Sequence, residues 1–470
     1  MNADKNILSK EGYLIHKKKN KNIIEHIKEE LTVTPYLPFN KNVKPESFPV
    51  YLENEKYLCV PKYYGIQKFG KPNTNKELNG TNVNIIFNGK LRSNQLDIVN
   101  TVLNKMEIND GGLLSLGCGQ GKTVLSLYIA SILKVKTLVI VHKSFLLNQW
   151  IQRAKEFTNA NIGIIQQNKI DIDGKEIVIG MLQSISKDKY DSDIFRDFGL
   201  VIFDEAHHAP SKYFSKALPI IACKKTLALS ATPNRTDKLE KVLYWYFGDI
   251  LYKAPTETIN NVLVKLIKYN IKDPNFREYK QNYGQDINRP KTINKLIQIA
   301  KRNTFIINNI KEILEEDQRK LLVLSDRIEH LTILKDLLQF EVSTSFYIGG
   351  LKQKVLDEAE KAQVIFATYS MAAEALDIPE LNTLFMVTPR KEVEQAVGRI
   401  TRKKDHPVQP LIFDLIDQLP SFARQSSYRR KFYNQKGFII KLIEVEENEI
   451  INEINETNEI NEDESELFID

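Results

Sequence analysis

The sequence of 470 residues is poor in cysteine and contains no long apolar run. Its three cysteines, Cys59, Cys118 and Cys223, lie far apart and match no metal-binding spacing. This excludes a disulfide scaffold and indicates reduced thiols in an intracellular protein. No stretch of about 18 uncharged apolar residues is present, and the lysine-rich N-terminus does not resemble a secretory signal. We therefore expect an intracellular protein that does not bind a membrane.

Basic residues exceed acidic ones along most of the chain. The net charge of +6 is an average, because Glu444–Asp470 contains twelve acidic residues and no Lys or Arg. The rest of the chain has 66 basic residues against 48 acidic ones, a net charge of +18. Such an excess fits a polyanionic partner, but a lysine-rich solvated surface gives the same count, so charge alone does not decide the function.

Residues 1–90 differ in character from the rest. Four lysines between positions 17 and 21 form a basic cluster, a helical pattern covers Asn22–Leu31, and four prolines between positions 35 and 49 break up the later apolar runs. We predict a small mixed α/β accessory domain over 1–90, for which nucleic-acid binding is a candidate role.

From Leu91 onward, short apolar runs alternate with longer amphipathic segments. This alternation is typical of buried strands in a parallel α/β sheet. A first set of strands is expected at Gly112–Leu116, Leu138–Val141, Ile177–Met181, Leu200–Phe203 and Thr226–Leu229. A second set, preceded by a helical segment at Ile293–Leu314, is expected at Leu321–Leu324, Val364–Ala367, Leu384–Val387 and Leu411–Phe413. Two sheets predict two tandem α/β domains, at 91–255 and 291–443, with a linker over 256–290.

The C-terminal segment 444–470 is acidic, and Asn448–Glu466 repeats Asn, Glu and Ile. It has no aromatic residue before Phe468. Because such a segment cannot bury enough apolar surface to offset its ordering entropy, we expect an acidic disordered tail.

A phosphate-binding loop is predicted at Leu116–Thr123, which reads Leu-Gly-Cys-Gly-Gln-Gly-Lys-Thr. It stands between an apolar strand pattern and a helical one, as such a loop requires. Gly117, Gly119 and Gly121 would let backbone N–H groups close around phosphates, and the helix N-terminus adds positive potential. Lys122 would then reach the β and γ phosphates of ATP, and the Thr123 hydroxyl would bind Mg²⁺.

Two acids, Asp204 and Glu205, follow the apolar run Leu200–Phe203. Open α/β sheets bind ligands at the carboxyl ends of their strands, so both acids are expected at the same sheet edge as the phosphate loop. Asp204 would hold Mg²⁺, and Glu205 would orient and deprotonate the attacking water.

Together these motifs resemble superfamily 2 helicases of the DEAH-box kind, because Asp204–His207 reads Asp-Glu-Ala-His. Further motifs follow in the family's order over residues 91–415. The resemblance implies two RecA-like domains with ATP in the cleft between them and nucleic acid across both. Gln95 resembles the glutamine that reads adenine. Ser230-Ala231-Thr232 resembles the motif that couples hydrolysis to strand movement, with His207, Ser230 and Thr232 as coupling residues.

The same resemblance implies contacts with nucleic acid. Val141–Ser144 resembles motif Ia, Met181–Ser184 a later strand-contacting motif, Leu324–Arg327 motif IV, and Ala367–Ser370 the start of motif V. The implied contact residues are His142, Lys143, Gln183, Ser184, Arg327 and Thr368.

Gln395–Arg402 resembles motif VI and implies catalytic roles for Gln395, Arg399 and Arg402. The two arginines, three residues apart, are predicted to share one helical face, and their planar forks suit a transferring phosphoryl group. Asp377, in motif V, would meet the ribose. The family usually has Gly where this chain has Ala375; if that position needs a positive φ, alanine costs on the order of 1 kcal/mol.

A narrower resemblance points to XPB-type and UvsW-type DNA helicases, and more closely to the transcript-release helicases of poxviruses and other large cytoplasmic DNA viruses. The segments that carry it are Val60–Gly65, Leu147–Trp150, Tyr347–Gly350 and Thr388–Arg390. A viral source would place the protein in the host cytoplasm or the virion.

We therefore expect an ATP- and Mg²⁺-dependent motor that acts on nucleic acid, with DNA favoured over RNA. Alternatives are an RNA helicase, a double-strand translocase that does not separate strands, and a non-motor ATP-binding switch or scaffold. A restriction-type motor subunit is also conceivable, although we find no nuclease motif in the chain. We expect a monomer that works with transcription or replication machinery.

Overall fold

The computed structural model describes residues 6–456 except 37–44, 118, 188–189, 232–234, 236, 256–257, 260, 282–285, 339–340, 375, 377 and 404. The chain divides into two compact units, Met1–Ala254 (unit 1) and Pro255–Asp470 (unit 2), which we describe separately. In the described part of the chain, no helix is both long enough and apolar enough to span a membrane.

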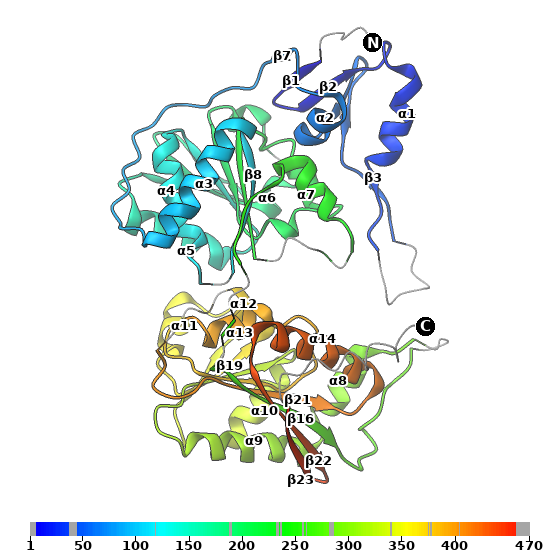
Figure 1. Ribbon diagram of the computed structural model, residues 1–470, viewed down its shortest axis with the longest axis vertical. Helices are drawn as coiled ribbons and strands as arrows, with labels where there is room; N and C mark the ends of the chain where they lie inside the picture. Colours follow the sequence, from blue (N-terminus) through cyan, green and yellow to red (C-terminus); the bar gives the residue numbers. More distant parts are fainter. Residues whose placement is uncertain are drawn as a thin grey trace. The chain divides into compact units, whose positions relative to one another are not determined.

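Unit 1 is built around an eight-stranded sheet in the order β11-β10-β12-β9-β13-β14-β8-β15 (Figure 1). Its strands are β8 (Gly111–Ser115), β9 (Thr137–Val141), β10 (Ile162–Gln166), β11 (Lys169–Asp171), β12 (Ile177–Met181), β13 (Leu200–Phe203), β14 (Lys225–Ser230) and β15 (Ile250–Lys253). Neighbours pair in parallel except β10 and β11, which are antiparallel. The first predicted set of buried strands is thus confirmed.

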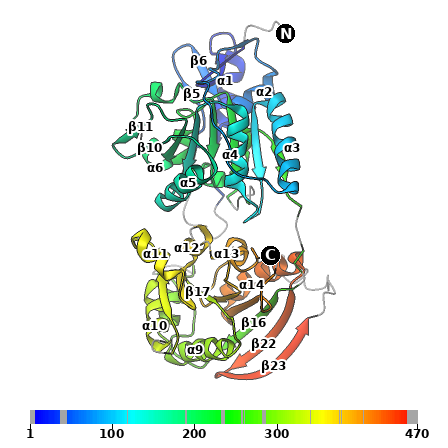
Figure 2. The ribbon, with the colours of Figure 1, turned by 90° about the vertical axis from the view of Figure 1, so that its left-hand side faces the viewer.

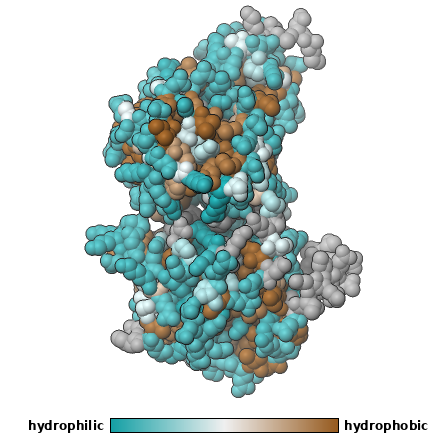
Figure 3. Space-filling view, turned by 60° about the vertical axis from the view of Figure 1, so that its left-hand side comes forward, coloured by the Kyte–Doolittle hydropathy of each residue, from teal (hydrophilic) through white to brown (hydrophobic). Residues whose placement is uncertain are grey.

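Helices cover both faces of this sheet. One face carries α3 (Ser93–Asn109), α4 (Lys122–Leu133) and α5 (Ser144–Phe157), and the other carries α6 (Leu182–Ile185) and α7 (Glu240–Phe247). Because strand side chains alternate, β9 places Val139 and Val141 in the first core and Leu138 and Ile140 in the second. Figure 3 shows exposed apolar residues, in brown, on the surface of unit 1 that carries α3 and α4.

The N-terminal region, predicted as a small mixed α/β domain, contains a small sheet and two helices. Its elements are β1 (Ile7–Ser9), β2 (Gly12–His16), α1 (Lys21–Glu30), β3 (Thr32–Val33), β4 (Phe48–Pro49), β5 (Leu52–Glu53), β6 (Tyr57–Val60), α2 (Lys62–Phe69) and β7 (Thr74–Asn75). The sheet order is β5-β6-β2-β1-β7, and β3 pairs with β4. Its hydrophobic core also includes Leu239, Val242 and Trp245 of α7, so this region is not packed as an independent domain.

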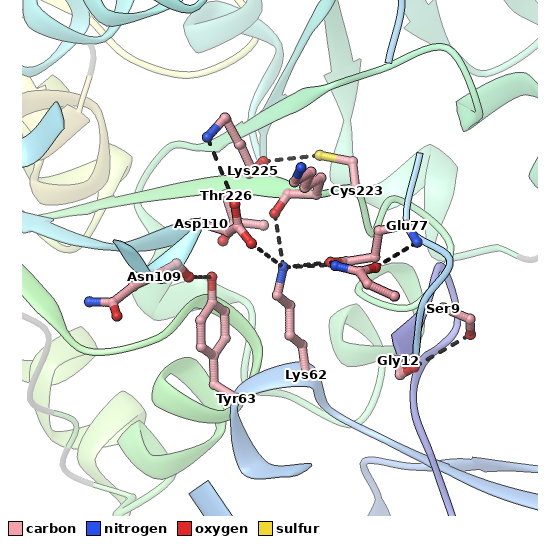
Figure 4. A network of polar contacts seen from close by, with 12 residues as sticks. Ser9, Gly12, Lys62, Tyr63, Glu77, Asn109, Asp110, Cys223, Lys225 and Thr226 are labelled. Carbon is pink, nitrogen blue, oxygen red and sulfur yellow. Dashed lines mark hydrogen bonds and ion pairs between the residues drawn. The ribbon is translucent and has the colours of Figure 1, made fainter. Parts of the chain in front are cut away.

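A buried charged network joins α2 to the large sheet. The Lys62 ammonium donates to both carboxylate oxygens of Glu77, at 2.9 and 3.0 Å, and to the Lys224 carbonyl at 3.0 Å (Figure 4). It also lies 3.6 Å from Asp110, which directly precedes β8. The Tyr63 hydroxyl donates to the Asn109 carbonyl at 3.0 Å. The accessory region is therefore tied to the start of the strand that leads into the phosphate loop.

Unit 2 repeats the architecture with an eight-stranded sheet in the order β18-β19-β17-β20-β21-β16-β22-β23 (Figure 2). Its strands are β16 (Leu263–Asn270), β17 (Leu321–Ser325), β18 (Thr344–Tyr347), β19 (Val364–Thr368), β20 (Thr383–Met386), β21 (Leu411–Asp417), β22 (Ile439–Glu446) and β23 (Glu449–Glu456). Its helices are α8 (Arg289–Leu296), α9 (Ala300–Leu314), α10 (Ile328–Leu338), α11 (Gln353–Ala359), α12 (Tyr369–Glu374), α13 (Glu394–Ile400) and α14 (Pro420–Lys436). The second predicted strand set is confirmed, and the predicted helical segment is two helices, α8 and α9.

Two sequence predictions about unit 2 are wrong. The predicted linker 256–290 contains β16, an inner strand between β21 and β22. The lysines of β16 hid its strand pattern, but in the sheet Lys268 Nζ lies 3.1 Å from Glu444 Oε1. The prediction of a disordered tail from residue 444 is wrong for 444–456, which form the end of β22 and the whole of β23 and pair antiparallel. The rest of the predicted tail, 457–470, lies outside the described residues. Backbone pairing and a Lys441–Glu453 ion pair order this edge although Ile450 and Ile454 remain exposed.

Unit 2 is held together internally by buried ion pairs. The Arg302 guanidinium of α9 donates to both oxygens of Asp417 at the end of β21, at 2.7 and 2.9 Å, and both side chains are 0% exposed. Arg429 of α14 makes the same two-pronged contact with Asp414, at 2.7 and 2.8 Å. Each pair fixes a helix to β21.

We expect Asp417→Ala to destabilise unit 2 by about 3–5 kcal/mol, because it leaves the Arg302 charge buried without its carboxylate. Native-state hydrogen exchange of the β21 amides in the full chain measures this loss. The control is Glu341→Ala, whose partner Lys311 is 41% exposed, and which should change stability by less than about 1 kcal/mol. Equal effects of the two substitutions would show that the buried pair has no special structural role.

Candidate functional site

The phosphate loop connects β8 to α4 at the carboxyl edge of the unit 1 sheet. Gly119 and Gly121 have φ angles of +78° and +84°, which residues with a Cβ atom rarely adopt. The Gly117 N–H donates to the Gln120 side chain at 2.7 Å, so the loop closes on itself. Lys122 begins α4 and Thr123 follows it in the first turn, both partly exposed. Cys118 lies outside the described residues.

Gln95, the predicted adenine-reading residue, lies against this loop. Its Oε1 accepts the Arg92 backbone N–H at 3.0 Å, which fixes the side chain at the start of α3. Its Nε2 lies 2.6 Å from the point that a Cβ on Gly121 would occupy. The glutamine and the loop therefore form one continuous surface, and a larger residue at position 121 would collide with Gln95.

Asp204 and Glu205 follow β13 at the same sheet edge. Asp204 is buried, and burial together with the nearby Glu205 raises its pKa to about 6. Glu205 has a φ of +47°, a left-handed conformation that is uncommon for residues other than glycine. In this conformation its Oε1 lies 3.6 Å from Lys122 Nζ. The acids and the loop lysine, predicted from separate motifs, therefore meet.

His207 connects the acidic motif to the end of β14. Its Nδ1 lies 3.3 Å from Glu205 Oε2 and 3.3 Å from the Ser230 hydroxyl. Burial lowers the pKa of His207 and favours the neutral imidazole. A chain of contacts thus runs from Lys122 through Glu205 and His207 to Ser230. Thr232, the other predicted coupling residue, lies outside the described residues.

The residues predicted to contact nucleic acid in unit 1 are close together but largely buried. His142 packs its ring 4.0 Å from that of His208, between ring centroids, and the Gln183 amide donates to the His142 carbonyl. The Ser184 hydroxyl accepts the Gln167 backbone N–H at 2.9 Å. Only Lys143 and Gln183 of this set are partly exposed, so His142 and Ser184 are placed to support this segment from within.

Trp150 is a site residue that motif reasoning missed. Its indole N–H donates to Asp204 Oδ2 at 2.8 Å, and both side chains are buried. In the sequence Trp150 falls on the apolar face of a helical pattern, where it reads as an ordinary core residue. Its polar indole N–H, which needs a partner when buried, was the signal that could have found it.

In unit 2, motif VI occupies α13. Arg399 is buried and donates to the carbonyls of Leu376, at 2.8 Å, and Ala373. The helix ends at Ile400, so Arg402 lies beyond it and the prediction that both arginines share one helical face is wrong. Gln395 is partly exposed in the first turn of α13. Asp377 and the Ala375 position lie outside the described residues.

Arg327 and Thr368 stand at the carboxyl edge of the unit 2 sheet. Arg327 follows β17, and its Nε donates to the Asn294 side chain at 2.6 Å. Thr368 is the last residue of β19, with its hydroxyl 3.3 Å from that of Ser370. Both are partly exposed, as contacts with a ligand require.

Comparison with known proteins agrees with this geometry. A putative ATP-dependent RNA helicase of Acanthamoeba polyphaga mimivirus is 35% identical over 466 residues, covering 95% of this chain and 88% of the relative. The chain belongs to the superfamily 2 helicases. A putative helicase of Invertebrate iridescent virus 6 is 27% identical over 379 residues, covering 76% of this chain and 83% of the relative.

Two further comparisons concern parts of the chain. The family described as "Type III restriction enzyme, res subunit" matches residues 88–235, which include the phosphate loop, the acidic motif and Ser230. The fragment structure of a putative HsdR subunit of a type I restriction enzyme from Vibrio vulnificus has a TM-score of 0.53 at 16% identity, covering 78% of this chain and 71% of that one. This likeness shows the fold: tandem RecA-like domains with a small N-terminal sheet domain.

This helicase uses ATP, and its family binds nucleic acid. The ligands that a magnesium ion prefers are hard oxygens, and the buried Asp204 carboxylate and the Thr123 hydroxyl are of that kind. The residues present therefore fit the Mg²⁺ that ATP hydrolysis typically requires.

We expect Trp150→Phe to move the acid limb of the pH–rate profile of ATP hydrolysis to higher pH. The wild-type pKa of Asp204 is raised to about 6, and the indole N–H stabilises its ionised form. Loss of this donor raises the pKa further, so activity disappears sooner as the pH falls. The control is Trp245→Phe, which changes the other tryptophan, a residue packed on Tyr64. An unchanged acid limb in Trp150→Phe would mean that Trp150 only fills space.

Proposed function

We propose that this helicase hydrolyses ATP to move along, or open, DNA, and that the residues assembled above carry out the roles that their motifs imply. The observation that carries the proposal is the contact chain Lys122–Glu205–His207–Ser230, which joins three sheet-edge segments. A motor needs such a chain, because a change in the phosphates bound at Lys122 must alter the contacts of residues other than Asp204 and Glu205. Here the contacts extend to Ser230.

In the proposed mechanism the loop amides and Lys122 bind the ATP phosphates, and Gln95 contacts the adenine. Asp204 and Thr123 would hold Mg²⁺, which would supply positive charge to the ATP phosphates. Glu205 accepts a proton from the attacking water, and its contact with Lys122 holds the carboxylate beside the phosphate loop. Asp377 meets the ribose, and Gln395, Arg399 and Arg402 act on the transferring phosphoryl group.

Coupling runs through His207, Ser230 and Thr232. Since the neutral His207 ring contacts both Glu205 and Ser230, a change at Glu205 after hydrolysis alters what Ser230 can bond. On the nucleic acid, Lys143, Gln183, Arg327 and Thr368 make direct contacts, and His142 and Ser184 position their neighbours. These contacts go mainly to the phosphate backbone, which makes binding sequence-tolerant and salt-sensitive.

Within the superfamily we place the chain with the DEAH-box proteins of the XPB and UvsW type, and closest to viral transcript-release helicases. The viral relatives support the wider part of this placement, among helicases of large DNA viruses. The placement also favours DNA as the substrate and a monomeric protein. It further favours a protein that acts with viral transcription or replication machinery, in the host cytoplasm or the virion. RNA stays the competing substrate, because the mimivirus relative is named an RNA helicase.

The deciding experiment compares ATP hydrolysis with single-stranded DNA, double-stranded DNA and RNA, together with a strand-displacement assay. We expect DNA to stimulate hydrolysis more than RNA, and a tailed DNA duplex to be opened. Stimulation without strand displacement would indicate a double-strand translocase. Stronger stimulation by RNA would overturn the DNA assignment, and no stimulation by any of the three would indicate a non-motor switch.

Glu205→Gln should reduce ATP turnover by about 10²–10⁴-fold while leaving ATP binding intact, because the amide keeps the shape but cannot accept a proton. Turnover and binding of a fluorescent nucleotide are measured on the same preparation. Glu156→Gln changes a surface glutamate paired with Arg153 and serves as the control. Near-wild-type turnover in Glu205→Gln would rule Glu205 out as the base.

Replacing Arg399 and replacing Arg402 by alanine should have different effects on local structure. An arginine that stabilises the transition state can contribute about 10³–10⁵ in rate, so Arg402→Ala should cut turnover strongly. Arg399→Ala should cut turnover and also loosen the motif V segment, because it removes two hydrogen bonds to the Ala373 and Leu376 carbonyls. Hydrogen exchange across residues 369–378 separates the two effects. Full stimulated turnover in Arg402→Ala would contradict its assignment.

A further inference from the structure

A basic surface of unit 2 extends beyond the helicase motifs, over the β20–α13 connection and α14. The 17-residue helix α14 has five basic residues and no acidic one. Its buried face is fixed by Arg429, which is bonded to Asp414 and to the Arg390 carbonyl. Figures 1 and 2 show α13 and α14 side by side in unit 2. The rigid attachment holds the exposed face of α14 beside the segment Pro389–Lys391.

Tyr428 stands on that exposed face with 54% of its surface accessible. The Lys391 ammonium lies over its ring, 4.0 Å from the centroid. Arg424 and Lys431, one helical turn before and after Tyr428, are also exposed. An exposed aromatic ring among positive charges is the arrangement with which proteins bind unpaired nucleotides: the ring stacks on a base while the cations attract phosphates.

Two arginines, Arg289 and Arg390, approach the carboxylate of Asp326, and a third, Arg327, donates to the Asp326 backbone carbonyl. Arg390 Nη1 lies 3.5 Å and Arg289 Nη2 3.9 Å from the Asp326 oxygens, and Arg327 is the next residue in the chain. Arg289 and Arg390 have 38% and 46% of their side chains exposed. One carboxylate cannot neutralise three guanidinium groups, so a net positive charge faces solvent here. Arginine's planar fork suits a phosphate oxygen pair at such a place.

We propose that Tyr428, Lys391, Arg390 and Arg289 form a binding track for a single strand of nucleic acid, with one unpaired base stacked on Tyr428. The proposal rests on the proposed function, because it extends the path marked by Arg327 and Thr368. The proposed track is continuous with that path, because the Arg390 guanidinium lies 5.7 Å from the centroid of the Tyr369 ring. Tyr369 directly follows Thr368 in the chain. An unpaired strand is specified because a paired base does not offer its face to a side chain.

The base-stacking half of the track is tested with Tyr428→Ala and the conservative Tyr428→Phe. Binding of a fluorescent oligothymidylate and a fluorescent oligouridylate is compared with binding of an abasic strand of equal length. A stacked base contributes about 1–3 kcal/mol, so Tyr428→Ala should bind the normal strands about 5- to 150-fold more weakly. Tyr428→Phe should bind like the wild type. On the abasic strand, wild type and Tyr428→Ala should bind equally, because no base remains to stack.

The phosphate half is tested by the salt dependence of single-strand binding. Arg289→Ala and Arg390→Ala should each lower the slope of log affinity against log salt by about 0.7, the value for one phosphate contact on a single strand. Arg196→Ala is the control, since Arg196 pairs with Asp193 on the surface of unit 1. Lys391→Ala is matched by Lys335→Ala, which removes another lysine over an aromatic ring, 5.3 Å from the Phe346 centroid.

The outcomes separate this proposal from the proposed function. A wild-type chain that binds none of the strands overturns the proposed function, and this track with it. Normal wild-type binding with unchanged affinity in Tyr428→Ala, or with equal losses on normal and abasic strands, overturns the track alone. A thermal melt of each variant guards against unfolding, which an exposed substitution should not cause. A deficit with oligothymidylate only, or with oligouridylate only, identifies the strand that uses the ring.

Discussion

The unit 1 site depends on one constraint, that the parallel strands β13, β14 and β8 end at the same sheet edge. Their register places Phe203 opposite Ala228, and Ser230 opposite Ser115. The residues that follow these strands are therefore neighbours, although the phosphate loop and Ser230 are more than a hundred positions apart. A slip of one residue in either pairing would turn the strand faces over and separate Glu205 from Lys122.

The accessory region depends on the same sheet. Its core is completed by Leu239, Val242 and Trp245 of α7, the helix that follows the Ser230 motif, and the Tyr36 N–H donates to the Asp237 carbonyl at 2.9 Å. Lys62 is fixed at the opposite end of β8 and β14, beside Asp110 and Lys224. The accessory region is therefore attached to the first α/β domain through α7 as well as through the starts of β8 and β14.

Buried ion pairs fix helices to the sheet in unit 2, as the Lys62–Glu77 pair ties α2 to the sheet in unit 1. Arg302 with Asp417, and Arg429 with Asp414, fix α9 to the end of β21 and α14 to its middle. Buried pairs of this kind are costly to break, because removing one partner leaves an uncompensated buried charge. The second of these pairs also bonds to the Arg390 backbone, so the structural pair and the exposed basic surface are parts of one assembly.

The sequence alone determined the tandem sheets, the phosphate loop, the acidic pair and the order of the motifs, because each is a local pattern of apolar runs, glycines and charges. Tertiary structure decided the rest. Strand β16 was hidden by its lysines and β23 by its acidic residues, because the ion pairs Lys268–Glu444 and Lys441–Glu453 form only when the strands lie side by side. The Trp150–Asp204 bond joins residues 54 positions apart, and no local pattern predicts it. Arg402 does not share a helical face with Arg399, because α13 ends at Ile400. The spacing of the two arginines in the sequence does not predict where the helix ends.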